Sequence, residues 1–523
     1  MKKPISLHHL VAGLVILVLG LALGLPHIND MPAYIHAWAQ ADWYSIALGF
    51  SENGFDFFHP ETFHYNKQFP GAWHTAYDTT ITSVDFPIHE YIVALLMGLF
   101  GTTAPWVFRS WTLVCSLLGM WFFYLCCERI TGHWLKGLAV VVMGMTSPLY
   151  AYYFNSYLPC APALALAMAG VWASIRYWQE DELRYWHWAI VLLTLSALIR
   201  TSFLVLPVAV CAYEAIRMLR KECTLRSKLW SVIPAVAVVI GYMLWNQHLR
   251  DTYGTLFLGN LRPAEDKDDL VWICEKVHRD WKLIYFTRLQ QILMTITVVA
   301  AALWMIIKRQ RPSKLWLLAG IWFVGEVMFV TAMLHQFIDH DYYFLDSLYL
   351  VTLFIFALAL NELPTVTKRV PLMVCGVVLL LLGGTMYNAA KHETQRRADP
   401  NDRAYQCCLN YEGSAAWLDS LGVSREARIL TPMAYPQNTP FIQMQRKGYA
   451  LMWGYLDLEQ SALTFPFDYV VVEDEIIRQE IENQQHFLGH LERLSGNGKL
   501  SLCHWCDSIV CTTAEEFLAI EAL

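Results

Sequence analysis

Long apolar runs that are almost free of charge recur along this chain as far as about residue 388. Examples are Leu10–Leu25, Trp230–Trp245, Ile292–Ile307, Leu315–Leu334 and Val370–Leu382. A helix needs about 20 mostly apolar residues to cross a bilayer, and most of these runs approach that length. Because a soluble core has no use for so many, the pattern predicts a polytopic α-helical membrane protein with about 10–11 transmembrane helices.

The segment between Asp85 and Arg217 predicts five crossings. The expected spans cover residues 90–101, 106–127, 135–153, 161–177 and 186–218. The last of them is too long for one straight helix and contains Arg200. We therefore expect two short helices, broken near Arg200, that together cross the membrane once.

Charged residues between the apolar runs indicate the orientation. Segment Arg217–Lys228 has five Lys or Arg residues and one acid, and Lys308–Lys314 has four and none. Lys and Arg concentrate on the cytoplasmic side, so both segments are expected to face the cytoplasm. Loop Pro26–Ile88 has one Lys and seven acids and is placed outside, as is the C-terminal tail.

The composition changes after about residue 388, where the apolar runs end. We assign residues 1–388 to a membrane domain, in which residues 26–88 are the first external loop with surface helices, and 389–523 to a small soluble α/β domain. The elements expected in this tail are a helix over Ser414–Leu421, strands over Arg428–Thr431 and Asp468–Val472, a helix over Glu473–Leu491 and a hairpin over Lys499–Thr512.

Overall composition agrees with this division, since 56% of the residues are hydrophobic and 16% are charged. The tail holds 11 basic and 19 acidic residues, and the whole chain has a net charge of −7. The membrane part is therefore close to neutral, and a basic surface for nucleic acid is absent. Cys503 and Cys506 have the spacing of a redox pair but lie in a strand-like segment, so a structural bond or inert thiols are favoured over redox catalysis or zinc.

The first external loop carries the strongest candidate for chemistry. Residues Ala37–Phe50 place apolar side chains at helical spacing along one side, which predicts an amphipathic helix lying on the membrane surface. Asp42 lies inside this helix. A lone acid in such a place is more often simply solvated, but a carboxylate at the bilayer surface can also accept a proton from a hydroxyl group.

Three ionisable residues close the same loop, because Asp85, His89 and Glu90 lie around Pro87 where the next apolar run begins. Proline and acids are ordinary at a helix start, so a stabilised helix N-terminus is the alternative to a functional site. Ionisable groups at both ends of one large loop nevertheless favour a site.

Two further features add donors. Arg200 interrupts an apolar stretch, and an ionisable group at membrane depth is costly enough to indicate function unless it reaches the surface. His340 and Tyr343 open a later span and offer donors that suit a phosphate, although aromatic residues at this depth also form ordinary interfacial belts.

With this arrangement the chain resembles the GT-C superfamily of polyprenyl-phosphate-sugar glycosyltransferases, which includes relatives of bacterial protein O-mannosyltransferases and the lipid A aminoarabinose transferases. The resemblance covers roughly residues 8–388. It rests on the order of Asp42 in the first external loop, Asp85-Phe86-Pro87 before the next span, Arg200 between short helices, and the segment His340–Tyr343.

The resemblance implies transfer of a sugar from a polyprenyl phosphate carrier at the external leaflet, with inversion of the anomeric centre. Asp42 would be the general base on the acceptor hydroxyl, and Asp85 would position the acceptor or share that role. Arg200, His340 and Tyr343 would neutralise the departing polyprenyl phosphate.

Additional substrate-binding residues are expected on the same side of the membrane. His89 and Glu90 are candidates at the end of the first external loop, and His278 and Arg279 are weaker candidates for the phosphate. Relatives commonly have an acid after the span that ends near Tyr153, whereas this chain has Asn155. We assign no residue as a metal ligand, and a divalent cation stays open as a cofactor.

The partners that the resemblance implies are the lipid-linked sugar donor, an acceptor glycan, lipid or protein, and membrane lipids, in a bacterial inner membrane with the tail in the periplasm. The alternative function is a transporter or flippase for a polyprenyl-linked glycan. Transporters usually show internal repeats with broken helices in matching halves, and this sequence shows none. A receptor or scaffold would explain the tail but not Arg200 or the acidic loop.

Overall fold

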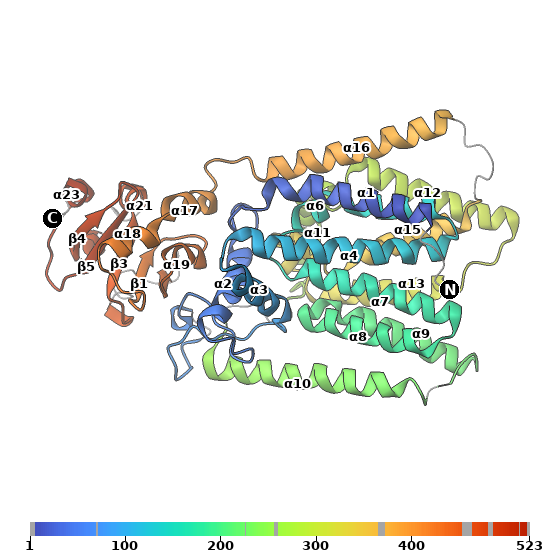
Figure 1. The fold of residues 1–523 in the computed structure, drawn as a ribbon, viewed down its shortest axis with the longest axis horizontal. Helices are drawn as coiled ribbons and strands as arrows, with labels where there is room; N and C mark the ends of the chain where they lie inside the picture. The colour runs from blue at the N-terminus through green and yellow to red at the C-terminus, as the bar shows by residue number, and fades with distance from the viewer. Residues whose placement is uncertain are drawn as a thin grey trace. The chain divides into compact units, whose positions relative to one another are not determined.

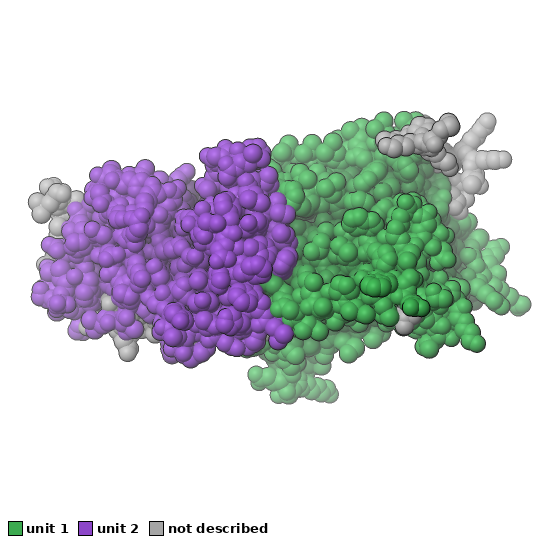
Figure 2. All heavy atoms as spheres, turned by 60° about the horizontal axis from the view of Figure 1, so that its bottom comes forward, with its two compact units in different colours: residues 1–29, 108–243, 259–396 green, residues 30–107, 244–258, 397–523 purple. Residues whose placement is uncertain are grey.

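The computed structural model describes residues 6–69, 72–224, 226–255, 260–364, 372–451, 463–479, 485–511 and 513–519. They form two compact units, each assembled from separate stretches of the chain. Unit 1 comprises Met1–Asn29, Phe108–Met243 and Gly259–Arg396, and unit 2 comprises Asp30–Val107, Leu244–Leu258 and Arg397–Leu523 (Figure 2).

Unit 1 is built from helices (Figure 1). They are α1 (Leu7–Gly24), α4 (Pro105–Thr131), α5 (Trp134–Met145), α6 (Pro148–Tyr153), α7 (Cys160–Glu180), α8 (Leu183–Ile199), α9 (Val205–Leu219), α10 (Leu229–Tyr253), α11 (Lys267–Tyr285), α12 (Arg288–Lys308), α13 (Leu315–Ala332), α14 (Gln336–Asp339), α15 (Leu348–Glu362) and α16 (Leu372–Arg396), with short 3₁₀ turns η1 (Leu25–His27), η4 (Thr201–Leu204) and η5 (Asp341–Phe344). Within the described residues, seven helical segments are long and apolar enough to cross a membrane, and α5, α8 and α15 are shorter apolar helices. The chain is therefore a multi-pass membrane protein.

The break that the sequence predicts at Arg200 is confirmed. Helix α8 ends at Ile199, Arg200 has extended backbone, and η4 begins at Thr201. The segment Thr201–Leu219 is long and apolar enough to cross a membrane by itself, and α8 with 17 residues is only slightly shorter. We expected α8 and the segment Thr201–Leu219 to cross the membrane once together, but their lengths also allow each of them to cross separately.

Unit 2 joins most of the loop of residues 26–88, which was predicted to be external, to the tail. The loop contributes α2 (Ala37–Glu52) and η2 (Asn66–Gln68), and α3 (Ile88–Phe100) follows at its end. The tail contributes α17 (Arg403–Tyr411), α18 (Ser414–Ser420), β1 (Ile429–Pro432), α19 (Asn438–Met444), β2 (Gly448–Leu451), β3 (Tyr469–Glu473), α21 (Asp474–Gln479), α22 (Gln485–Gly489), β4 (Leu491–Gly496), β5 (Leu500–Trp505) and α23 (Ala514–Ala519).

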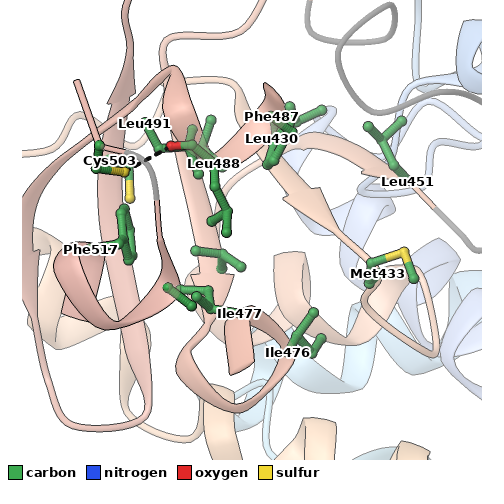
Figure 3. Packing of buried hydrophobic residues seen from close by; sticks show 14 of the residues in the cluster. Leu430, Met433, Leu451, Ile476, Ile477, Phe487, Leu488, Leu491, Cys503 and Phe517 are labelled. Atoms are coloured by element: carbon green, nitrogen blue, oxygen red, sulfur yellow. Dashed lines mark hydrogen bonds between the residues drawn. The ribbon is translucent and has the colours of Figure 1, made fainter. Parts of the chain in front are cut away.

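The tail strands form one mixed sheet in the order β2-β1-β3-β5-β4. β1 pairs with β2 and β3 in parallel, and β5 pairs with β3 and β4 in antiparallel. Apolar side chains from the strands and from α21, α22 and α23 bury one another in a single core, part of which Figure 3 shows. The expected α/β domain is therefore present.

Most of the elements expected in the tail are found, with two differences. The predicted helix at 414–421 and both predicted strands coincide with α18, β1 and β3. The charged segment after β3 forms α21 and α22, and the part between them lies outside the described residues. The hairpin consists of β4 and β5 rather than lying within 499–512, because Asn497 makes the turn between the strands and accepts the backbone N–H groups of Lys499 and Leu500.

The tail cysteines are free thiols. Cys407, Cys408, Cys503 and Cys511 are buried, and Cys506 is partly exposed. The CxxC spacing lies on strand β5 and its end, as expected, so neither sulfur lies at a helix start where a thiolate would be stabilised. This geometry is consistent with the prediction that Cys503 and Cys506 are inert thiols.

Helix α3 differs from the span expected over 90–101. Its 13 residues rise about 20 Å, which is short for a bilayer core, and the helix packs against α2 within unit 2. Helix α2 is present over the predicted range, but it is buried on nearly all sides from Gln40 to Phe50 instead of exposing a polar face. At Gly49 a Cβ atom would lie 2.2 Å from the Glu61 carbonyl oxygen, so the helix and the loop backbone are in direct contact.

Candidate functional site

Asp42 is enclosed in the interior of unit 2. Its side chain lies on α2 and its relative exposure is 4%. The Asn438 side-chain amide, at the start of α19, donates from Nδ2 to Asp42 Oδ1 at 2.8 Å. The solvated acid that the sequence allowed as an alternative is therefore wrong, because the fold surrounds this carboxyl group with protein.

Burial governs the ionisation of Asp42. Loss of hydration raises the pKa of this carboxyl group from 3.8 to about 8, while hydrogen bonds from Asn438 and Trp38 act in the opposite direction. A carboxyl group in this state holds its proton more tightly than an ordinary Asp. Its conjugate base is correspondingly stronger, and its titration falls close to neutral pH.

The acids at the end of the first external loop occupy the same unit. Asp85 is partly exposed, whereas His89 and Glu90 on the first turn of α3 have relative exposures of 2% and 0%. In the described residues, neither carboxylate oxygen of Glu90 has a hydrogen-bond partner. A buried acid without donors is unusual for a mere helix start, since most buried polar groups are satisfied. The sequence analysis placed these residues at the mouth of a span, whereas the structure has His89 and Glu90 buried at the start of α3, and their role in substrate binding stays a prediction.

Arg200 forms a buried ion pair in unit 1. Its Nε atom donates to Asp346 Oδ2 at 2.6 Å, and its guanidinium lies over the rings of Tyr342 and Tyr343 at 5.5 Å and 5.2 Å. The Asp346 side chain is fully buried and that of Arg200 is 16% exposed. His340 contacts the edges of both tyrosine rings. The predicted grouping of Arg200 with His340 and Tyr343 is thus present in one place.

A second buried arginine lies next to this cluster, and sequence reasoning missed it. Arg396, at the end of α16, pairs with Asp341 at 2.7 Å and lies over the ring of Tyr152 at 4.3 Å. Tyr153 donates to Asp341 at 2.7 Å, and its ring contacts Tyr342. We call these residues, together with those around Arg200, the arginine cluster.

The residues of this second ion pair stand next to apolar runs in the sequence, but their contact does not follow from any local pattern. Arg396 follows the last apolar run, and Asp341 and Asp346 flank the two tyrosines of the segment HDYYFLD. The short turn η5 contains Asp341, the partner of Arg396, and Asp346, the partner of Arg200, follows two residues after it. The prediction for this segment rested on His340 and Tyr343, whereas the structure shows that Asp341 and Asp346 hold the two arginines.

Glu326 is another acid that sequence reasoning missed. It interrupts the apolar helix α13, its relative exposure is 2%, and it accepts the Trp322 indole N–H at 2.8 Å. Such an acid at membrane depth is costly and is commonly retained for a function.

His278 and Arg279 lie away from these contacts, on the exposed side of α11. Arg279 is 71% exposed and pairs with the adjacent Asp280, and His278 contacts Lys282 on the same helix. Their geometry adds no support for a phosphate contact, and that role stays a prediction.

Asn155, at the position where the resemblance implied an acid, is fully buried. Its amide donates to the Gly24 carbonyl at 2.9 Å, and its backbone carbonyl accepts from the buried Arg109 at 3.3 Å. The Nδ2 group of Asn155 is thus used within the fold, while its buried Oδ1 atom has no hydrogen-bond partner among the described residues. Across the part of the chain that the structure describes, no three His, Cys, Asp or Glu side chains group as metal ligands.

Comparison with known proteins gives one family match and a set of similar structures. The model of the Dolichyl-phosphate-mannose-protein mannosyltransferase family matches residues 85–248. No curated protein is significantly similar to the chain in sequence.

Similar solved structures cover most of the chain at low identity. Archaeoglobus fulgidus oligosaccharyltransferase in complex with Zn and sulfate has a TM-score of 0.53 and 10% identity, covering 95% of this chain and 73% of that one. ArnT from Cupriavidus metallidurans bound to undecaprenyl phosphate has a TM-score of 0.52 and 11% identity, covering 94% and 97%. The arabinofuranosyltransferase AftD from Mycobacteria has a TM-score of 0.50 and 14% identity, covering 90% and 37%. At such identities the likeness establishes the fold.

Proposed function

We propose that this chain, which has the fold of the GT-C superfamily of glycosyltransferases, transfers a sugar from a polyprenyl-phosphate-linked donor to an acceptor hydroxyl group at the external face of the membrane. The transfer inverts the anomeric centre. The observation that carries the proposal is the buried, hydrogen-bonded Asp42 in the first external loop. A membrane protein with no chemistry to perform has little reason to enclose a lone acid there.

Asp42 acts as the general base. The acceptor hydroxyl gives its proton to the carboxylate as its oxygen attacks the anomeric carbon, and the bond from that carbon to the phosphate oxygen breaks. A base is most effective when its pKa lies near the working pH, and the pKa of about 8 meets this condition. Asp85 positions the acceptor or shares the proton, and His89 and Glu90 contribute to binding from the start of α3.

The arginine cluster receives the departing polyprenyl phosphate. Negative charge grows on the phosphate oxygen as the glycosidic bond breaks, and a guanidinium stabilises such charge with well-directed donors. Asp346 and the two tyrosine rings hold Arg200 in one orientation, so little side-chain entropy is lost on binding. Tyr343 and His340 act with Arg200 on the same group. The undecaprenyl phosphate bound by ArnT is the kind of ligand that we propose here.

Replacement of the base tests this function directly. A strain without this protein is complemented with the wild-type chain or with Asp42→Asn, and surface glycans, lipids and glycoproteins are compared by mass spectrometry. The sugar that the wild type restores should be absent with Asp42→Asn, because loss of a general base lowers turnover by about 10²–10⁴-fold.

Asp56→Asn is the matched control. Asp56 is an acid of the same loop, but its side chain is 50% exposed and pairs only locally with His59. This variant should restore the modification, and membrane levels of both variants are measured by immunoblot. Full restoration by Asp42→Asn would remove the base from the mechanism, and a strain lacking the protein that accumulates a lipid-linked glycan on the cytoplasmic side would favour the flippase.

A further inference from the structure

The contact between Asp42 and Asn438 joins residues 396 positions apart. Asn438 is fully buried on α19 of the tail, and α19 packs against α2. No pattern in the sequence indicates a role for this tail residue. We propose that Asn438 is a positioning residue for Asp42, so that the C-terminal tail supplies a donor that orients the general base. This inference rests on the proposed function.

The orientation of the Asn438 amide is fixed by its second contact. The backbone N–H of Phe63 donates to Asn438 Oδ1 at 3.1 Å, while Nδ2 donates to Asp42. A flipped amide would place two donors against each other at Phe63 and two acceptors against each other at Asp42. The amide is therefore held as a donor toward the carboxylate, and it orients the Asp42 carboxyl group.

The loop segment around Phe63 is itself held by the edge strand β2. The Gly448 N–H donates to the Phe63 carbonyl at 3.0 Å, and the Tyr65 N–H donates to the Gly448 carbonyl at 2.9 Å. A Cβ atom at Gly448 would lie 1.8 Å from the Ile429 carbonyl oxygen, so only glycine fits this crossing. The loop is thereby attached to the sheet by backbone bonds.

Side chains on both sides of this crossing strengthen the attachment. Lys447 pairs with Glu61 at 2.5 Å. Arg428 pairs with Asp78 at 3.4 Å, and the Tyr449 hydroxyl also donates to Asp78. The donor to Asp42 therefore belongs to a frame with several independent contacts, as precise positioning of a catalytic group requires.

A purely structural asparagine is the competing explanation. It would stabilise the fold to the same extent at every pH, whereas a donor aimed at Asp42 matters more when Asp42 is charged. The other titratable groups on α3, which packs against α2, are His89, Glu90 and Tyr91, and Tyr435 precedes α19. An Asp42→Asn background separates their titration from that of Asp42.

Thermal unfolding of the purified full-length chain provides the first test. Asn438→Ala should lower the Tm more at about pH 9, where Asp42 is charged, than at about pH 6. In the Asp42→Asn background this pH-dependent part should vanish. An equal loss at both pH values would overturn the proposal, and it would do so without reference to any substrate.

Turnover provides the second test. In membranes supplied with the donor and acceptor that the complementation identifies, Asn438→Ala should lower kcat by about 10- to 100-fold with little change in the KM of the donor. The pH at which the activity of Asn438→Ala rises should be higher than in the wild type, because the Asp42 carboxylate has lost a donor. Asn438→Ser, which keeps a short side-chain donor, should recover part of the loss.

Asn410→Ala is the matched control for both tests. Asn410 lies in the same tail and donates to a buried carboxylate, Glu473, at 2.6 Å, but not to Asp42. It should reduce stability without moving the pH dependence or kcat. If Asp42→Asn is inactive while Asn438→Ala matches Asn410→Ala, only this inference fails. If Asp42→Asn keeps its turnover, the proposed function fails.

Discussion

At the residue scale, Asp42 links stability and activity through one proton. Burial favours the protonated carboxyl group, whereas the proposed chemistry needs the carboxylate. The fold therefore holds this residue in its less reactive form over much of the neutral range and carries a cost when the proton leaves. Catalytic groups often lower the stability of the fold in this way. The pH dependence of kcat/KM reports the effect on activity, and the pH dependence of Tm reports the effect on stability.

The pH dependence of activity follows from the raised pKa. Because Asp42 must be deprotonated to accept the acceptor proton, kcat/KM should increase with pH and level off above about 8. The profile is measured in membranes at constant ionic strength. Asp56→Asn should reproduce the wild-type curve. A rate that is independent of pH from about 6 to 9 would exclude Asp42 as the titrating base.

The pH dependence of stability should run in the opposite direction. The pKa of Asp42 in the folded chain, about 8, lies above its ordinary value of 3.8, so its contribution to stability is complete below about pH 4 and is lost as the pH rises through 8. Asp42→Asn should therefore have a Tm similar to the wild type at about pH 4 and a higher Tm at about pH 9. Unfolding in detergent, followed by intrinsic fluorescence, measures both.

Arg200 is expected to act on the donor. Arg200→Ala should raise the KM for the lipid-linked donor by about 10-fold or more, because a charge-assisted contact to phosphate is lost. Arg200→Lys preserves the charge opposite Asp346 and should fall between Ala and wild type, since Lys lacks the planar fork. Arg184→Ala, at the exposed start of α8, is the control. An unchanged response to donor concentration would contradict the phosphate contact.

At the element scale, local patterns predicted more than contacts between distant segments. The apolar runs, the helix break at Arg200 and strands β1 and β3 follow from short-range periodicity and from one charged residue. Asn438 and Arg396 could not be assigned in this way, because each contacts an acid that is distant in the sequence. Asn438 donates to Asp42, and Arg396 pairs with Asp341. Likewise, α2 was predicted to be amphipathic, but α3 and α19 pack against it and the helix is buried from Gln40 to Phe50, which the sequence of α2 alone does not reveal.

Packing of the apolar helices depends on small residues at close crossings. A Cβ atom at Gly119 of α4 would lie 2.5 Å from Ala165 Cα of α7, whereas one at Gly320 of α13 meets nothing within 4 Å. Gly119→Leu should therefore destabilise the chain by about 1–3 kcal/mol, and Gly320→Leu should be neutral or slightly stabilising. Thermal unfolding in detergent compares the two. Equal Tm values for the two variants would contradict close packing of α4 on α7.

At the scale of the whole molecule, the division by composition differs from the division by contacts. The apolar runs end near residue 388, so composition separates the tail from everything before it. The compact unit that contains the tail also includes residues 30–107 and 244–258. Backbone bonds between Phe63, Tyr65 and Gly448 join the loop to the sheet, and such pairing leaves no trace in the composition of either segment.

This joint unit should unfold as one. Leu430→Ala removes a fully buried side chain from the core of the tail and should cost about 2–5 kcal/mol. Because the first external loop is attached to β2 and buries Asn438 against α2, hydrogen exchange should accelerate in peptides of the loop as much as in peptides of the tail. Leu193→Ala, an equally buried change on α8 of unit 1, should leave both sets of peptides unchanged. If Leu430→Ala accelerated exchange only in the tail, the tail would be a separately folding domain, and a donor that it carries could not hold Asp42 firmly enough to set its protonation.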